Sequence, residues 1–311
     1  MRYGLPYKGS KNGIAHWIVN NLPPGECLVD LFCGGGAVTH CAMLSGKWER
    51  FIMNDIDGRL PILFRDCALG KYTTKTRPEW ISRTMFHYLK EKDAYVALVW
   101  SFGNNGIDYL YGENIEEFKH AYHILVYYSD PEPIRRYGYN IQLSHSPDVI
   151  RRYYNYKAQI RHQTTSRELG AYPFDLDSTV RQIEIERMQS IQSLQSLTGL
   201  QSLQSLTSDY RAVQIPQNAV IYCDIPYKGT NGGKYDGFDH ESFYEWALEQ
   251  DNIFISEYAM PEPFIEIAST KKSILSTSNG DAGKAVEKLF VNPRTYERYN
   301  GVCCDRQLTL F

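Results

Sequence analysis

The stretch Ala219–Tyr227 constrains the fold more than any other part of the sequence. Its first five residues are apolar and partly β-branched, which predicts one buried strand. They run directly into Asp224, Ile225, Pro226 and Tyr227. We therefore expect a carboxylate, a stiffened backbone and an aromatic ring at the carboxyl end of a strand, where open α/β sheets bind their ligands.

A second functional pattern lies near the start of the chain. Residues 27–32 read as a strand that contains Asp30 and Phe32, residues 33–38 form a glycine-rich turn, and a helix follows to about residue 44. Glycines let the backbone approach a ligand, and amides at a helix start favour an anion. The pattern indicates a nucleotide-type cofactor, but Thr39 stands where the dinucleotide fingerprint requires a small residue.

The next predicted strand, residues 51–53, leads into Asn54 and Asp55. Asp55 follows Asp30 by about 25 residues, close to the position where such folds keep an acid for ribose hydroxyls. An acid at this place also serves as a helix N-cap. Both interpretations remain open from the residues alone.

The alternation of strands and helices stops at residue 58 and resumes after about residue 210 with a helix at 240–249. Further strands are predicted at 252–258, 273–277 and 288–291. The sequence thus predicts an α/β fold with a mixed, Rossmann-like sheet and helices on both faces. Residues 1–57 and 211–311 form this domain, and residues 58–210 are inserted into it.

The insertion contains a run of arginines interleaved with aromatic residues, which suits phosphate contacts and base stacking. The candidate phosphate contacts are Arg135, Arg136, Arg151 and Arg152. The alternative is a helix with a solvated charged face.

The insertion also contains a Gln/Ser/Leu repeat at residues 188–206, with an apolar residue at every third position. A period of three predicts a 3₁₀ or extended arm, because such a stripe drifts around an α-helix. Its glutamines suit the reading of adenine edges, and a packing arm or spacer is the alternative.

Composition narrows the function classes. The formal net charge of −3 does not indicate a general nucleic-acid binder, so a local basic patch is required. The seven cysteines lack the spacing of a metal site and read as reduced thiols. Because no signal core and no run of about eighteen apolar residues occurs, we expect a cytoplasmic protein without metal or membrane contact.

Three motifs, in this order, resemble those of the Dam-like (D12 class) adenine-specific DNA methyltransferases. Pro6–Lys11 matches P-x-x-G-x-K, Phe32–Gly36 matches F-x-G-x-G, and Asp224–Tyr227 is similar to D-P-P-Y. Residues 255–258 (ISEY) and 287–291 (EKLFV) also resemble the family. Ile225 departs from the pattern, because the family has proline there.

The resemblance implies transfer of a methyl group from S-adenosylmethionine to the exocyclic amino group of a flipped-out adenine in double-stranded DNA. Asp224 and the carbonyl of Ile225 would accept hydrogen bonds from the amino group, and Tyr227, after Pro226, would stack on the base. The implied cofactor-binding residues are Tyr7, Lys8, Lys11, Asp30, Phe32, Gly34, Gly36, Asp55 and Asp224.

Other readings stay open at this point. A methyltransferase that acts on RNA or on a protein amide is the alternative enzyme, and a catalytically silent DNA-binding homologue is the alternative from another class. The sequence also leaves open a role in restriction, in regulation or in the protection of a phage genome.

Residues 307–311 (QLTLF) resemble the pentapeptide that binds the bacterial sliding clamp, with Gln307, Leu308, Leu310 and Phe311 as its anchors. An edge strand is the alternative for this segment.

Overall fold

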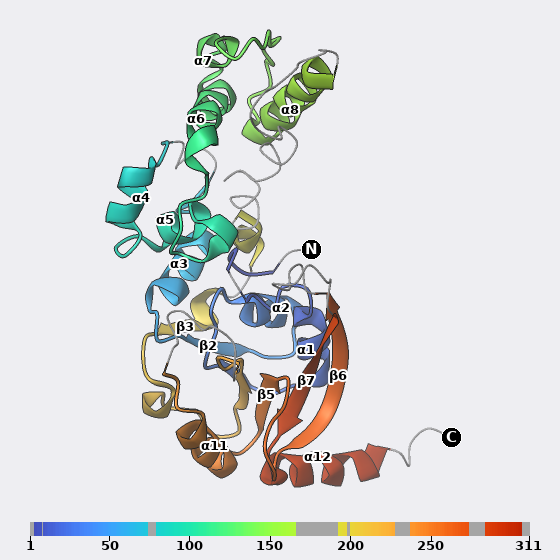
Figure 1. Ribbon diagram of the computed structural model, residues 1–311. Coiled ribbons are helices and arrows are strands. Elements are labelled where there is room, and N and C mark those ends of the chain that lie inside the picture. Colours follow the sequence, from blue (N-terminus) through green and yellow to red (C-terminus); the bar gives the residue numbers. More distant parts are fainter. Residues whose placement is uncertain are drawn as a thin grey trace. The chain divides into compact units, whose positions relative to one another are not determined.

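Seven strands form one mixed sheet in the order β3-β2-β1-β4-β5-β7-β6 in the computed structural model (Figure 1). The structure describes residues 3–7, 9–73, 79–165, 192–197, 200–227, 237–273 and 284–306. The strands are β1 (Cys27–Asp30), β2 (Arg50–Asn54), β3 (Leu203–Leu206), β4 (Val220–Cys223), β5 (Ile253–Glu257), β6 (Ile265–Ser273) and β7 (Lys284–Val291). Strands β1 to β5 run parallel, and β7 is antiparallel to both β5 and β6. The predicted mixed α/β sheet is confirmed.

The α-helices that the structure describes precede, separate and follow these strands, and several lie in the insertion. They are α1 (Ala15–Asn21), α2 (Ala37–Ser45), α3 (Arg59–Ala68), α4 (Arg83–Leu89), α5 (Ala94–Val99), α6 (Glu113–Tyr128), α7 (Glu132–Arg135), α8 (Val149–Thr165), α11 (His240–Glu249) and α12 (Pro293–Arg306). The short 3₁₀ helices are η1 (Phe102–Asn104), η2 (Ser193–Ser196), η3 (Leu200–Ser202) and η4 (Tyr210–Ala212).

Both faces of the sheet are covered, which explains why its central strands are continuously apolar. Alternate residues of β1 and β4, among them Val29 and Ile221, belong to a core that includes Phe243 of α11. The residues between them point to the opposite face, where α2 packs against β1 and β2 (Figure 1). This alternation decides which side chains meet at the carboxyl edge.

The strand β6 was not expected from the sequence. It begins at Ile265 and ends at Ser273, so only the first residue of the predicted strand at 273–277 is a described strand residue, and 274–277 lie outside the described ranges. Its apolar residues end at Ala268, and the polar residues that follow include Lys271 and Lys272, which is typical of an edge strand rather than a buried one.

The chain divides into two compact units. The first comprises residues 1–5, 9–68 and 196–311, and the second comprises residues 6–8 and 69–195. This boundary differs from the predicted insertion at 58–210, because α3 belongs to the first unit and β3 pairs with β2, Phe51 opposite Leu203. We propose that residues 69–195 are the part that recognises DNA.

The Gln/Ser/Leu repeat is therefore split between the units. Its described part forms the 3₁₀ helices η2 and η3 and then the strand β3. A 3₁₀ or extended conformation is what the period of three predicts. Residues 188–191, 198 and 199 lie outside the described ranges.

The second unit has a core of its own, built mainly from α6 and α8. Tyr139, Tyr153, Tyr156 and Ile160 are buried in it together with Tyr122, whose hydroxyl donates to the Tyr153 carbonyl over 2.8 Å. Aromatic residues of the predicted stacking run thus fill this core. They fix α8, which carries Arg151 and Arg152.

Candidate active site

Two carboxylates lie where the strand order of the sheet reverses. From β1 the sheet continues through β2 and β3 on one side, and through β4 and β5 on the other. The order of the strands therefore reverses between β1 and β4. Asp30 is the last residue of β1, and Asp224 directly follows β4. In open α/β sheets, ligands bind in the crevice at such a switch point.

The alternation along β4 separates Asp224 from its neighbours. Cys223 and Ile225 are buried in the core on the α11 side. Asp224 points to the opposite face and meets Lys11, whose Nζ lies 2.5 Å from Asp224 Oδ1. The sequence predicted both residues as site residues, and the structure brings them together although they are far apart in the chain.

Lys11 lies between two carboxylates. Its side chain is only 4% exposed, and its Nζ also lies 3.7 Å from Oε1 of the fully buried Glu287. Burial acts to lower the pKa of Lys11, but the charges of Asp224 and Glu287 outweigh burial and raise it above the ordinary value. Lys11 is therefore a stable buried cation.

The ring of Tyr227 is held from several sides. Its hydroxyl donates a hydrogen bond to Oε1 of Glu287, and the Nζ of Lys11 lies 4.6 Å from its ring centroid. The ring of Tyr258 lies 4.5 Å away at an interplanar angle of 56°. Burial and the neighbouring carboxylates raise the pKa of Tyr227, so its hydroxyl stays protonated and remains a donor.

The backbone between Asp224 and Tyr227 is fixed by two further contacts. The side chain of Ile225 is 2% exposed and packs in the core, where an apolar side chain replaces the proline ring of the family pattern. The carbonyl of Pro226 accepts a hydrogen bond over 2.8 Å from Nε2 of His240, the first residue of α11.

The glycine-rich turn between β1 and α2 has a conformation that requires glycine. Gly34 and Gly36 have positive φ angles of 48° and 69°. A Cβ on Gly36 would lie 2.6 Å from a ring carbon of Phe64, so neither the conformation nor the space allows a larger residue. The turn thus presents bare backbone at the carboxyl edge of the sheet.

Asp55 organises this turn. Its buried carboxylate accepts hydrogen bonds from the amide of Gly34 over 2.8 Å and from the amide of Asp57 over 2.9 Å. The amide of Arg59, the first residue of α3, contacts Oδ1 of Asp57 over 3.4 Å. A contact of Asp55 with a ribose remains a proposal.

Asp30 is a buried carboxyl group at the base of the turn. Its Oδ2 accepts a hydrogen bond from Thr39 over 2.7 Å, and its Oδ1 has no hydrogen-bond partner among the described residues. Burial raises the pKa of Asp30 to about 7. Thr39, which departs from the dinucleotide fingerprint, therefore holds the Asp30 carboxyl group through a hydrogen bond. An unsatisfied polar atom beside a turn of bare backbone fits a nucleoside-type cofactor.

The remaining predicted cofactor residues are placed differently. The ring of Phe32 packs among Tyr210, Phe238 and Phe243, with centroid distances of 5.5–5.7 Å, which puts it with the α11 core. Tyr7 is partly buried and belongs to the second unit, and Lys8 lies outside the described residues.

The four predicted DNA-contacting arginines differ in their surroundings. Arg135 and Arg136 are exposed, and Arg135 forms an ion pair with Glu132. Arg151 is 82% exposed on α8 and has a loose contact of 3.8 Å with Asp148. These three side chains are accessible to a phosphate backbone.

Arg152 has a structural role that differs from the predicted phosphate contact. Its guanidinium donates hydrogen bonds to the carbonyls of Val126 and Tyr127 in the last turn of α6, over 2.9 and 3.4 Å. A third bond of 2.9 Å reaches the carbonyl of Ser146. Arg152 thus satisfies carbonyls at a helix C-terminus, which otherwise lack donors.

Three site residues were not identified from the sequence: Tyr258, His240 and Glu287. Tyr258 and Glu287 stand in the ISEY and EKLFV segments, whose resemblance to the family was the only signal available. Glu287 reaches the site because β7 pairs antiparallel with β5, which puts Lys288 opposite Glu257. Nothing in the sequence around His240 indicated that this residue belongs to the site.

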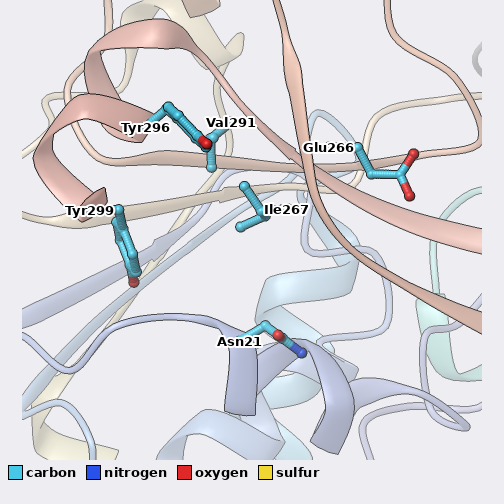
Figure 2. Close-up of a pocket in the computed structure, with 6 residues that line it drawn as sticks. All are labelled: Asn21, Glu266, Ile267, Val291, Tyr296 and Tyr299. Atoms are coloured by element: carbon cyan, nitrogen blue, oxygen red, sulfur yellow. The ribbon is translucent and has the colours of Figure 1, made fainter. Parts of the chain in front are cut away.

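Other features lie apart from this site. Figure 2 shows a pocket of about 360 Å³ lined by Asn21, Glu266, Ile267, Val291, Tyr296 and Tyr299, none of them a predicted site residue. Among the described residues, no group of side chains suited to a metal ion was found. No helix in the described ranges is long and apolar enough to cross a bilayer. Residues 307–311 lie outside those ranges.

Comparison with known proteins agrees with the geometry. A model of the D12 class N6 adenine-specific DNA methyltransferase family matches residues 7–258, which is well over half of the chain. No curated protein matches the chain. The family match begins within the Pro6–Lys11 motif and includes the glycine turn and the Asp224–Tyr227 loop. The chain therefore belongs to the D12 class of N6 adenine-specific DNA methyltransferases.

Proposed function

We propose that this enzyme methylates adenine at a specific site of duplex DNA after the base has left the helix stack. In this proposal, Asp224 and the backbone carbonyl of Ile225 accept hydrogen bonds from the exocyclic amino group, and Tyr227 stacks on the flipped base. The observation that carries the proposal is the Lys11–Asp224 pair beside the Tyr227 ring at the switch point of the sheet.

The chemical difficulty is the weak nucleophilicity of the amino group, whose lone pair is delocalised into the purine ring. Two acceptors at Asp224 and Ile225 draw its hydrogens out of the ring plane and localise the lone pair on nitrogen. The nitrogen then forms its bond to the methyl carbon and releases one proton to water. In-line positioning of the two reactants contributes on the order of 7–11 kcal/mol to lowering the barrier.

S-adenosylmethionine is the methyl donor of the family and supplies an electrophilic methyl group on a sulfonium, whose sulfur keeps the electron pair of the broken bond. The residues suited to hold it are Gly34, Gly36, Asp30 and Asp55. The backbone of the turn offers close approach, and the buried Oδ1 of Asp30, which has no hydrogen-bond partner among the described residues, offers a polar contact.

The target base must leave the helix, because the enzyme cannot reach the amino group of an adenine that is paired inside the duplex. Extrusion of the base costs a few kcal/mol. Stacking on Tyr227 offsets roughly 1–3 kcal/mol of that cost. The ring is already held by Glu287 and Tyr258, so little side-chain freedom is lost when the base arrives.

The proposal is tested by following a tritiated methyl group from S-adenosylmethionine. The purified protein is offered duplex DNA, RNA or protein, and labelled nucleosides are separated after digestion. We expect the label in N6-methyldeoxyadenosine from duplex DNA. Label found only in RNA or protein, or no transfer at all, would contradict the proposal. Sequencing the modified bases then maps the target site.

The exposed face of α8 is the best candidate for DNA contact in the second unit. Arg151, Tyr154, Asn155 and Arg161 are all exposed, and their spacing puts them on one side of the helix. Arginine offers phosphate contact, and the tyrosine and asparagine offer stacking and base-edge contacts.

Arg151 and Arg152 are adjacent, yet we expect opposite effects of their replacement. Arg151→Ala should weaken DNA binding and lower the slope of log K against log salt by about 1, with unchanged stability. Arg152→Ala should lower the free energy of unfolding by about 1–3 kcal/mol and leave the salt slope unchanged. Titrations at several salt concentrations and urea unfolding distinguish the two; a reduced slope for Arg152→Ala alone would contradict this assignment.

We also propose that residues 307–311 bind a sliding clamp. Support comes from the pentapeptide QLTLF, with a glutamine and two apolar anchors. Removal of these five residues should abolish recovery of purified clamp in a pull-down while methylation of short duplexes is retained. Equal recovery of the clamp with and without the segment would contradict the proposed clamp binding.

A further inference from the structure

One buried ammonium serves two carboxylates in the active site. The Nζ of Lys11 lies 2.5 Å from Asp224 and 3.7 Å from Glu287. Lys11 is 4% exposed and Glu287 is fully buried, so water screens these charges little. The two negative charges keep the single cation within the cluster, but they do not fix which carboxylate it contacts more closely.

The proposed chemistry requires Asp224 to accept a hydrogen bond from the amino group of adenine. In the structure, its Oδ1 already accepts a charged donor at 2.5 Å. A charge-assisted bond is roughly twice as strong as a neutral one, so the ammonium competes with the amino group for the carboxylate. Full acceptor strength at Asp224 is reached when Lys11 has another partner.

Glu287 offers that partner. Its Oε2 is buried and has no hydrogen-bond partner among the described residues, a state that is costly for a carboxylate. The other oxygen, Oε1, lies 3.7 Å from the Nζ of Lys11, so the ammonium needs to move only about 1 Å to form a charge-assisted bond of ordinary length with it. Oε1 also accepts the hydroxyl of Tyr227, and a carboxylate oxygen has a second lone pair for Lys11.

We propose that Glu287 is a positioning residue for methyl transfer: it receives Lys11 when the target adenine occupies Asp224, and it fixes the ring of Tyr227 through the hydroxyl. This inference rests on the proposed function. The exchange keeps the ammonium paired throughout, so the arrival of the base does not leave a buried charge unpaired.

The substitutions Glu287→Gln and Glu287→Asp separate a role of the charge from a role in packing. Glutamine keeps the length and an acceptor for Tyr227 but loses the charge that receives Lys11. Aspartate keeps the charge but is shorter. We expect Glu287→Gln to lower kcat on the order of 10- to 100-fold with little change in KM for S-adenosylmethionine. Glu287→Asp should retain more activity than Glu287→Gln.

A packing role predicts the reverse order, because glutamine fills the space of glutamate and aspartate does not. Higher kcat for Glu287→Gln than for Glu287→Asp, or wild-type kcat for Glu287→Gln, would overturn the inference. Glu266→Gln on the edge strand β6, where the side chain is 39% exposed, is the matched control and should keep wild-type kcat. Urea unfolding of each variant separates loss of activity from loss of fold.

Tyr227→Phe gives a second measurement that does not depend on the folding of the Glu287 variants. It keeps the ring and removes only the hydroxyl, so Lys11 can still move to Glu287. We expect a smaller loss of kcat than for Glu287→Gln. An equal or larger loss would show that Glu287 acts through the hydroxyl alone. Wild-type protein that does not methylate adenine would instead refute the proposed function itself.

Discussion

Asp224→Asn is expected to lower kcat for adenine methylation by a factor on the order of 10²–10³, the usual effect of removing one preorganised hydrogen-bonding group from a transition state. Asparagine has the shape of aspartate but only one acceptor oxygen. Lys11, 2.5 Å from the carboxylate in the wild type, would lose this charged partner and shift toward Glu287. The uncharged amide offers the amino group of adenine a weaker acceptor than the carboxylate, and its NH₂ group is a donor that repels the amino group.

Single-turnover rates with saturating S-adenosylmethionine measure this effect. Asp251→Asn is the matched control, since Asp251 is an exposed aspartate of the same unit, and it should react at the wild-type rate. Binding of S-adenosylmethionine by the Asp224 variant shows that the cofactor site is intact. A rate above one tenth of the wild type corresponds to a loss of less than about 1.4 kcal/mol and would show that Asp224 does not take part in methyl transfer.

Gly36→Ala is expected to destabilise the first unit by about 2–5 kcal/mol. The left-handed conformation at φ 69° costs an alanine about 1–2 kcal/mol, and overpacking against Phe64 costs about 1–3 kcal/mol more. Affinity for S-adenosylmethionine should fall as well, because relief of the clash deforms the turn. Urea unfolding and calorimetric titration measure the two effects.

Gly46, at the other end of α2, provides the control for this substitution. Its φ of 70° is nearly the same, but a Cβ there would meet no atom within 4 Å. Gly46→Ala should therefore cost only the conformational part, about 1–2 kcal/mol, and leave cofactor affinity unchanged. Equal destabilisation by the two alanines would mean that the contact with Phe64 carries no weight.

The central strands were predictable from sequence because burial on both faces leaves a continuous apolar run. The expected strand at Ala219–Cys223 corresponds to β4, and its end at Asp224 follows from the change from apolar to polar residues. The position of Asp30 and Asp224 at one edge then follows from parallel pairing. Local sequence therefore predicted the carboxylates and the glycine turn.

The contacts between distant segments were not predictable in this way. Glu287 meets Tyr227 across 60 positions, and this contact depends on the antiparallel insertion of β7 between β5 and β6. Arg152 and Arg151 look alike in sequence, yet only the packing of α8 on α6 decides which guanidinium is exposed. Side-chain direction around a helix needs the partner surface, which a single sequence does not give.

Ile225 combines a feature that the sequence shows with a packing contact that only the structure shows. The sequence marks it as a departure from D-P-P-Y, and in the structure its side chain is buried in the core that includes Phe243 of α11. His240 holds the next carbonyl, that of Pro226, and so contributes rigidity from a helix start. Stiffness of the loop is thus distributed over several residues.

The central claim is that Asp224 accepts the amino group of the target adenine. Once the target site is mapped, it is tested most directly by binding duplexes that carry adenine or purine, which lacks the amino group, at the target position. Wild-type protein and Asp224→Ala are compared in the presence of a non-reactive cofactor analogue. Differences in base pairing between the two duplexes cancel between the two proteins. We predict that the wild type distinguishes adenine from purine and that Asp224→Ala does not; the same discrimination in both proteins would contradict the account.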